Sequence, residues 1–325
     1  LLEEVYASRG YILARVTEVS DDPDGTINIQ IDEGTINSVK FVGNTKTKNF
    51  VVQRNILTKP GDIYNENLIK QDLMRLYGTQ AFKNVTRTIE QNDDNPDKYD
   101  VTINLEEQRS GTISIGGGID TVTGLFGTAG FSDNNFRGTG QRVGIIAMLG
   151  SGTVNTDESM VNRANYQLEL SWFEPRLRNT DNSLLVKAFY RDFASYQIPQ
   201  AIEQRLGLEA IIARPFKTIP NLLGSFGIGL EGVNVKEGDE DKIKRLYNEH
   251  NIPFEERAKQ LKGGIFLTLS PSVTYDTRDD ALNPRRGVYG NIRFDESIGV
   301  SDLSKTFGKL TGSIKEAYYN CISTA

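Results

Sequence analysis

Cysteine and histidine are nearly absent from this 325-residue chain, which contains one residue of each. A single cysteine excludes an internal disulfide framework, and the scarcity of both residue types excludes a zinc site built from several Cys and His ligands. No Ser-His-Asp or Cys-His triad can be assembled except on His250. His250 stands in the polar segment NEHNIPFEE, where a solvated loop histidine is the simpler interpretation.

Long hydrophobic runs are absent as well. No stretch of about 18 apolar residues occurs, so the sequence predicts no transmembrane helix. The chain starts with LLEEVYASRGY, which lacks the basic start and apolar core of a signal peptide. We therefore expect the sequence to begin inside a domain. A transmembrane β-barrel stays compatible with this composition, because its strands alternate polar and apolar residues.

No candidate enzyme site is found in the sequence. The carboxylates of Asp276, Asp279 and Asp280 lie in a predicted turn beside Arg278 and two further arginines. Ion pairs that order the turn explain this cluster better than acid–base chemistry does. We expect no enzymatic activity, no cofactor and no metal site. The net charge of −6 also argues against a nucleic-acid partner.

The first third of the chain mixes helical and strand patterns. From Glu33 onwards the order is β-α-α-β-β, ending near Glu107. Asn65 is placed to cap the second helix, whose apolar stripe includes Leu73. Thr47 is placed to cap the first helix. Residues 1–33 read as the last helix and strands of a preceding copy, which predicts a repeated module of about 75 residues.

After Arg109 the helical periodicity stops and alternating strands follow one another. Strands of about ten residues are long for a soluble sandwich and suit a tilted crossing of a membrane. The sequence predicts ten of them, near residues 111–119, 124–132, 140–149, 163–173, 183–191, 204–214, 221–235, 264–276, 286–295 and 306–314. The connections after the second, fourth, sixth and eighth strands are short or rich in Pro, Gly and Arg. They are expected at the end of the sheet where the chain enters, and the charged loop 236–262 at the opposite end.

Several segments resemble a known family. VKFVGNT (39–45), GDIY (61–64) and DLMRLYGTQAFKNV (72–85) resemble a POTRA domain of the BamA-type outer-membrane assembly proteins. The stretch from Gly111 that contains GGGIDTVTGLFGTAGFSDNNFRGTGQRV, together with SWFEPR (171–176) and YDTRDDALNPRRG (275–287), resembles the barrel of that family. The residue sequence of the glycine-rich strands is most similar to that of cyanobacterial and chloroplast members of the family.

The resemblance implies an α+β POTRA module followed by an all-β transmembrane antiparallel barrel. We expect residues 1–33 to be the C-terminal part of a preceding POTRA domain, 34–107 a POTRA domain, and 108–325 the N-terminal part of the barrel. Family members have sixteen barrel strands and an Arg-Gly-Phe/Tyr loop motif, whereas about ten strands and no such motif are found here. The ending EAYYNCISTA does not read as a family strand. The barrel is therefore expected to be truncated.

The resemblance also implies a function. The protein is expected to be an assembly factor, not an enzyme, in the outer membrane of a Gram-negative-type bacterium or in the chloroplast outer envelope. Its partners would be unfolded β-barrel precursors, the lipid bilayer and accessory periplasmic or lipoprotein subunits. The POTRA module would be periplasmic in the bacterial case. The alternative is a protein-conducting channel, either a two-partner secretion transporter or a chloroplast preprotein translocon.

Two segments are predicted to contact a client. In the family, the first barrel strand forms a lateral gate that pairs with an incoming strand. That strand is Gly111, Thr112, Ile113, Ser114, Ile115, Gly116, Gly117, Gly118 and Ile119. Three consecutive glycines offer few cross-strand contacts and would weaken the seam. The plainer alternative is a strand that tolerates close neighbours, with glycines that ease barrel curvature.

The second segment lies in the POTRA module. The strand that starts at Phe82 is a candidate edge strand, to which an unfolded client could add by β-augmentation. Its predicted client edge consists of Phe82, Asn84, Val85, Arg87 and Ile89. The alternative is an ordinary buried strand of the sheet.

Overall fold

The computed structural model describes residues 2–154, 158–280 and 284–317. The described residues form two compact units. The N-terminal unit consists of residues 1–111 and 133–141, and the strand unit consists of residues 112–132 and 142–325. No helix in the described ranges is long and apolar enough to cross a membrane.

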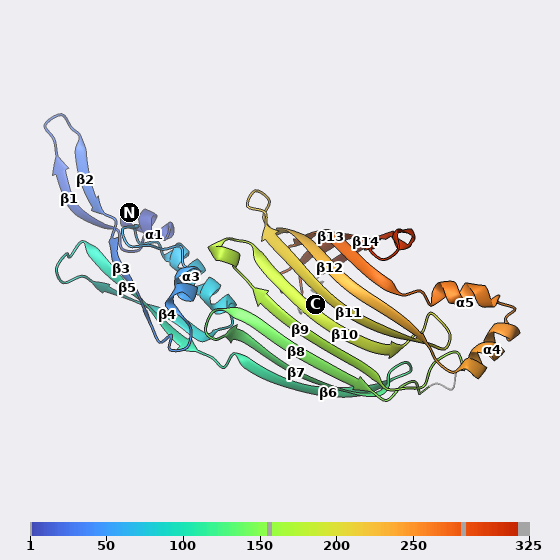
Figure 1. Ribbon diagram of the computed structural model, residues 1–325. Helices are drawn as coiled ribbons and strands as arrows, with labels where there is room; N and C mark the ends of the chain where they lie inside the picture. Colours follow the sequence, from blue (N-terminus) through green and yellow to red (C-terminus); the bar gives the residue numbers. More distant parts are fainter. Residues whose placement is uncertain (1, 155–157, 281–283, 318–325) are drawn as a thin grey trace, which may run out of the picture. The chain divides into compact units, whose positions relative to one another are not determined.

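The N-terminal unit contains three helices and five strands (Figure 1). A short helix and a separate hairpin come first: α1 (Leu2–Ser8), β1 (Arg15–Asp21) and β2 (Ile27–Asp32). The order β-α-α-β-β follows as β3 (Thr35–Val42), α2 (Asn49–Gln53), α3 (Glu66–Gly78), β4 (Phe82–Gln91) and β5 (Lys98–Glu107). These strands form one sheet in the order β3-β5-β4, with β3 parallel and β4 antiparallel to β5.

Helix α3 covers this sheet with one apolar stripe. Ile69 and Leu76 are fully buried against the β5 residues Val101 and Ile103, and Leu73 packs at the margin of the same cluster. The Asn65 side chain accepts hydrogen bonds from the first backbone N–H groups of α3, which confirms the predicted cap.

Helix α2 differs from the prediction. It begins after Lys48, which makes no side-chain cap, and it ends at Gln53, whereas the sequence pattern from Thr47 onwards predicts a helix that continues to about Leu57. Thr47 does not cap the helix, because its buried hydroxyl accepts a hydrogen bond from the Asn135 side chain instead. The side chain of Thr47 thus pairs with a residue 88 positions away in the chain and not with the first backbone N–H groups of the helix.

The strand unit contains the ten predicted strands in one antiparallel meander, in which each strand pairs with its neighbours in sequence (Figure 1). The strands are β6 (Gly111–Asp120), β7 (Gly124–Phe136), β8 (Gln141–Gly150), β9 (Asn165–Glu174), β10 (Ser183–Ala194), β11 (Ala201–Pro215), β12 (Leu222–Glu237), β13 (Gly264–Asp276), β14 (Gly287–Gly299) and β15 (Phe307–Ala317). Short 3-10 turns, η1 (Leu177–Asn179) and η2 (Leu303–Lys305), lie between strands. Of the unusual ending, residues 318–325 lie outside the described part of the chain.

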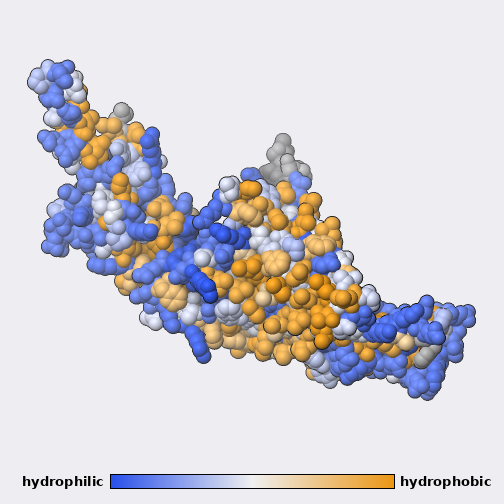
Figure 2. All heavy atoms as spheres, turned by 45° about the horizontal axis from the view of Figure 1, so that its top comes forward, coloured by the Kyte–Doolittle hydropathy of each residue, from blue (hydrophilic) through white to orange (hydrophobic). Residues whose placement is uncertain are grey.

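The two faces of this sheet differ in chemistry. The apolar face carries side chains such as Ile212, Phe226, Ile228 and Leu230, which are 40–50% exposed. Figure 2 shows apolar side chains gathered over the strands. The polar face carries hydrogen-bonded pairs, including Ser225 with Ser272 and Thr268 with Ser297. Such a division is typical of a strand that separates lipid from a polar interior.

The charged loop 236–262 is not an extended polar loop. It folds into α4 (Glu240–Glu249) and α5 (Phe254–Gln260). Ile243 and Tyr247, one turn apart on α4, are buried, and the guanidinium of the fully buried Arg257 donates to the backbone oxygens of Pro199 and Gln200. The high charge of the segment hid this two-residue apolar stripe from the sequence reading. His250 is exposed at the end of α4.

Candidate functional site

The first candidate site is the open side of β6. β7 pairs along one side of β6, and no strand among the described residues lies along the other. All nine residues of the predicted pairing strand lie in β6. Ile113, Ile115 and Ile119 are 73–85% exposed. The side of β6 that faces away from β7 is where a further strand, of the same barrel or of another chain, would pair.

Three consecutive glycines of β6 lie close to β7. A Cβ on Gly117 would lie 2.8 Å from the Phe126 carbonyl oxygen, which leaves no room for a side chain there. A Cβ on Gly118 would lie 3.0 Å from the Phe126 ring, and one on Gly116 would lie 3.0 Å from the Thr128 hydroxyl. The glycine run therefore permits a close approach inside the β6–β7 hairpin, in line with the plainer interpretation of a strand with close neighbours.

The second candidate site is the outer edge of β4. β4 is an end strand of its three-stranded sheet, paired with β5 on one side only among the described residues. Phe82 belongs to the buried core, and Val85 and Ile89 pack against that core. Asn84 is exposed. Most of the side chains predicted to contact a client are thus occupied within the unit, and the accessible feature of this edge is its backbone.

Arg87 is also occupied by its own unit. Its guanidinium donates to both carboxylate oxygens of Glu66 at 2.6 Å and to the Tyr64 hydroxyl at 2.9 Å. Burial raises the pKa of Tyr64 to about 12. Burial opposes ionisation of Glu66 too, but the Tyr64 hydroxyl and the Arg87 charge together lower the pKa of that carboxyl. Arg87 therefore holds β4 to α3 and is a structural residue.

The turn between β7 and β8 forms a third feature, which the sequence interpretation did not identify. Residues 133–141 belong to the N-terminal unit. The buried Asn135 donates to the Thr47 hydroxyl at 2.8 Å and accepts from the Gly140 N–H at 2.9 Å. The Lys48 N–H donates to the Gly138 carbonyl at 2.9 Å. The φ of Gly138 is +72°, and a Cβ there would lie 1.9 Å from the Lys46 carbonyl, so only glycine fits.

Glu107 organises the loop that receives this turn. Its carboxylate accepts hydrogen bonds from the Thr45 hydroxyl and from the backbone N–H groups of Lys46 and Thr47, at 2.5–2.9 Å. Burial opposes ionisation, but these hydrogen bonds prevail and lower the pKa of Glu107 to about 2. The loop residues 46–48, directly after the family-like segment 39–45, thus contact the turn 133–141. Residue spacing in the sequence alone could not predict this contact.

The turn between β13 and β14 is ordered by its carboxylates, as the sequence predicted. Asp276 accepts from the Arg278 guanidinium at 2.7 Å, and Asp279 accepts from the backbone N–H groups of Arg285 and Arg286 at 2.9 and 3.1 Å. Residues 281–283 of this turn lie outside the described ranges.

Comparison with known proteins identifies both parts of the chain. The Omp85 superfamily domain matches residues 135–324, and the POTRA family, described as a surface antigen variable number repeat, matches residues 35–108. The outer membrane protein assembly factor BamA of Neorickettsia risticii is 25% identical over 165 residues, which are 49% of this chain and 22% of that protein. The chloroplastic outer envelope protein 80 of Oryza sativa is 25% identical over 180 residues, 50% of this chain and 25% of that protein.

A solved structure shows the same fold. BamA from Haemophilus ducreyi lacking POTRA domains 1–3 superposes with a TM-score of 0.63 and 21% identity, over 92% of this chain and 56% of that chain. The ten-stranded sheet therefore corresponds to part of a larger barrel of this type. The chain spans only about a fifth to two fifths of the length of the curated relatives it matches.

Proposed function

Because the chain belongs to the Omp85 superfamily, we propose that it is part of an outer-membrane protein assembly factor. The POTRA module would receive unfolded β-barrel precursors, and β6 would offer its open edge to a client strand. The matched relatives are proteins of a bacterial outer membrane or a chloroplast outer envelope, and this chain is an outer-membrane protein. Nothing in this proposal requires enzymatic chemistry.

The position of β6 is the observation that carries the proposal: it is the first strand of the sheet, and it follows directly on the last strand of the POTRA module. Unpaired backbone groups cost several kcal/mol each in hydrocarbon, so a client strand inside a membrane gains from pairing with the side of β6 that faces away from β7 whenever that side is released. The client then buries its own apolar face in lipid and closes its own hydrogen bonds, which supplies free energy without ATP. The glycine run keeps β6 close to β7, and it would offer few cross-strand side-chain contacts to a strand on the other side of β6.

The edge of β4 is the second contact in this proposal. β-Augmentation uses main-chain hydrogen bonds for affinity, and the side chains of alternate residues add selectivity. The inward side chains of β4 are held by the core and by Glu66, so a client would meet the backbone and the outward residues Thr86 and Thr88, which are exposed. Such a contact would be weak and tolerant of sequence, as a factor with many clients requires.

The decisive experiment closes the gate reversibly. Full-length protein carries Cys321→Ser, one cysteine at Ile115 and a second on the strand that pairs with β6 in the complete barrel. Folding of a barrel client in liposomes is measured after oxidation and again after reduction. We expect activity to fall on oxidation and to return on reduction, because the client strand can no longer reach β6.

The matched control is a crosslink between two strands away from the edge. Ser225 and Ser272 face each other on β12 and β13, with their hydroxyl oxygens 2.6 Å apart. A disulfide between cysteines at these positions should leave activity unchanged. Full activity with a verified crosslink at β6 would exclude lateral gating and favour the alternative, a channel that conducts protein through its lumen. Gly117→Val is a poor substitute for this test, because its Cβ would meet the Phe126 carbonyl.

A further inference from the structure

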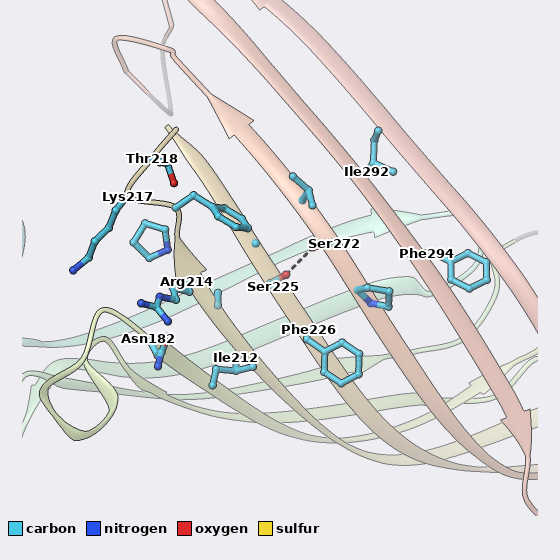
Figure 3. Close-up of a pocket in the computed structure, with 16 residues that line it drawn as sticks. Asn182, Ile212, Arg214, Lys217, Thr218, Ser225, Phe226, Ser272, Ile292 and Phe294 are labelled. Atoms are coloured by element: carbon cyan, nitrogen blue, oxygen red, sulfur yellow. Dashed lines mark hydrogen bonds between the residues drawn. The ribbon is translucent and has the colours of Figure 1, made fainter. Parts of the chain in front are cut away.

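An apolar hollow of about 900 Å³ lies on the apolar face of the strand unit, across β11, β12, β13 and β14 (Figure 3). Strand pairing places its lining in two rows. The row near the β11–β12 turn consists of four residues that pair in succession across neighbouring strands: Arg214, Gly224, Val273 and Ile292. In the next row, Ile212 pairs with Phe226, which pairs with Pro271. Paired residues share a face of the sheet, so all of these side chains line the same surface.

One position in the floor of the hollow is a glycine that is covered by an aromatic ring from a turn. Gly224 stands between Arg214 and Val273, and the ring of Phe216 from the adjacent turn folds to 2.9 Å from the place where a Cβ would lie. The hollow is thus lined by residues of β11, β12, β13 and β14 and of the two adjacent turns. Its volume falls in the range of about 300–1,000 Å³ that is usual for small-molecule sites.

The rim of the hollow is polar and basic at one end only. Arg214, Lys217, Thr218 and Asn182 line that end, and the remaining lining is mainly aliphatic or aromatic (Figure 3). Asp181 lies 3.1 Å from the Lys217 ammonium nitrogen. The hydrogen bond and charge of Lys217, together with the charge of Arg214, lower the pKa of the Asp181 carboxyl. Two cations thus share one carboxylate, which leaves positive charge at this end of the hollow.

The position of the basic end follows from the strand order. In an antiparallel meander, the β11–β12 turn lies at the same end of the sheet as the start of β6, where the chain enters from the POTRA module. In an outer-membrane protein with periplasmic POTRA domains this is the periplasmic end. The apolar floor then faces hydrocarbon, and the basic rim lies at the level of the lipid headgroups of the inner leaflet.

We propose that this hollow binds a diacyl phospholipid of the periplasmic leaflet through an anionic headgroup. The headgroup phosphate would be held by Arg214, with Lys217, Asn182 and Thr218 beside it. The acyl chains would lie over Phe226, Pro271 and the neighbouring apolar side chains. Arginine suits this role because its planar fork can make two hydrogen bonds to one phosphate. The proposal rests on the outer-membrane location of the chain and not on its assembly activity.

The test is native mass spectrometry of the full-length protein in detergent with either phosphatidylglycerol or phosphatidylcholine. Wild-type protein should retain one phosphatidylglycerol and bind it at least about tenfold more tightly than phosphatidylcholine, a difference of about 1.4 kcal/mol. Arg214→Gln with Lys217→Gln should abolish this preference. Val273→Trp, which fills the floor without changing charge, should reduce binding of both lipids.

Two controls keep the result specific. Arg178→Gln removes an exposed arginine from the neighbouring β9–β10 turn, outside the hollow, and should leave the preference intact. Inorganic phosphate should not displace the lipid, because the acyl chains contribute to binding. Equal binding of the two lipids by wild-type protein, an equal loss in Arg178→Gln, or unchanged binding in a folded Val273→Trp variant would each overturn the proposal. Heat-dependent gel mobility establishes that each variant is folded.

Discussion

The two units of this protein place their apolar side chains in opposite ways. In the N-terminal unit, Ile69, Leu76, Val101 and Ile103 are fully buried in one cluster. In the strand unit, residues of similar size on the apolar face stay about half exposed, and Ile292 is 64% exposed. The exposure of an apolar side chain therefore has to be judged against the solvent that surrounds it. The surface of the first unit suits water, and the apolar face of the second unit suits lipid.

The polar groups follow the same division. In the N-terminal unit, ion pairs and hydrogen bonds such as those of Arg87 hold a helix to a sheet. In the strand unit, they gather on the polar face, where Arg293 donates to Asp295 at 2.6 Å and Ser270 donates to the same carboxylate at 2.5 Å. Charges on one face and exposed hydrocarbon on the other are the arrangement expected of a membrane-spanning strand.

The largest effect is expected in the core of the N-terminal unit. Leu76→Ala removes a fully buried side chain and should lower the free energy of unfolding of this unit by about 2–5 kcal/mol. Leu73→Ala should cost less, because Leu73 is only partly buried against the same cluster. Hydrogen exchange of the α3 amides in the full-length protein, read in increasing urea, measures both. A loss below about 0.5 kcal/mol for Leu76→Ala would show that α3 does not carry the core.

The next prediction compares an exposed apolar side chain of the strand unit with one of the N-terminal unit. Ile228 is 48% exposed near the middle of β12, and Met74 is 66% exposed on α3. Ile228→Lys should destabilise the folded protein in lipid vesicles by about 2–4 kcal/mol, because it places a charge near the bilayer midplane. Met74→Lys exchanges one water-exposed helix former for another and should change stability by less than about 0.5 kcal/mol.

The measurement is urea unfolding from vesicles, with the folded fraction read from gel mobility for the strand unit and from α3 hydrogen exchange for the N-terminal unit. Similar effects for the two lysine variants would contradict the assignment of the apolar face to lipid. They would also remove the basis for placing a phospholipid in the hollow between β11 and β14.

The strands of the sheet could be predicted well, because alternation repeats over ten or more residues in each of them. The helix α3 was predicted for the same reason, with its stripe at Leu73 and Leu76 and its cap at Asn65. In both cases the signal is local and periodic. Helix α4 is as long as several of these strands, but only Ile243 and Tyr247 of it are buried. Two apolar positions in a charged stretch are too few to show a helical period, which explains why α4 was not predicted.

Contacts between distant residues could not be predicted from spacing. Threonine is a residue type that favours the N-cap position, but the buried side chain of Asn135 donates a hydrogen bond to the Thr47 hydroxyl instead. Arg87 lies on an edge strand and looks available, but Glu66 on α3 binds it. The glycines of β6 suggested a weak edge, but their tight neighbour is Phe126 inside the hairpin. In each case the competing partner is far away in sequence or on the other side of the strand.

The smallest predicted effect concerns the loop ordered by Glu107 and depends on pH. The pKa of Glu107 is about 2 in the folded state, below its ordinary value of 4.5. A lowered pKa stabilises the folded unit at pH values above the ordinary one, and this contribution is lost as the pH falls from about 5 towards 2. Glu107→Gln keeps one acceptor oxygen and should cost about 1–2 kcal/mol at pH 7. The cost should disappear near pH 2, where the wild-type carboxyl is itself becoming protonated.

Glu106→Gln is the matched control for this experiment, because Glu106 is the neighbouring residue of β5 and its side chain is 56% exposed in a pair with Lys83. An exposed pair of this kind contributes little, so the control should follow the wild-type pH profile closely. Urea unfolding of the N-terminal unit between pH 2 and 7 distinguishes the two. A pH profile shared by Glu107→Gln and wild type would mean that the carboxylate does not order the loop. The turn at 133–141 would then be held independently of pH in this range, by contacts such as those of Asn135 with Thr47 and of Arg54 with the Thr139 carbonyl.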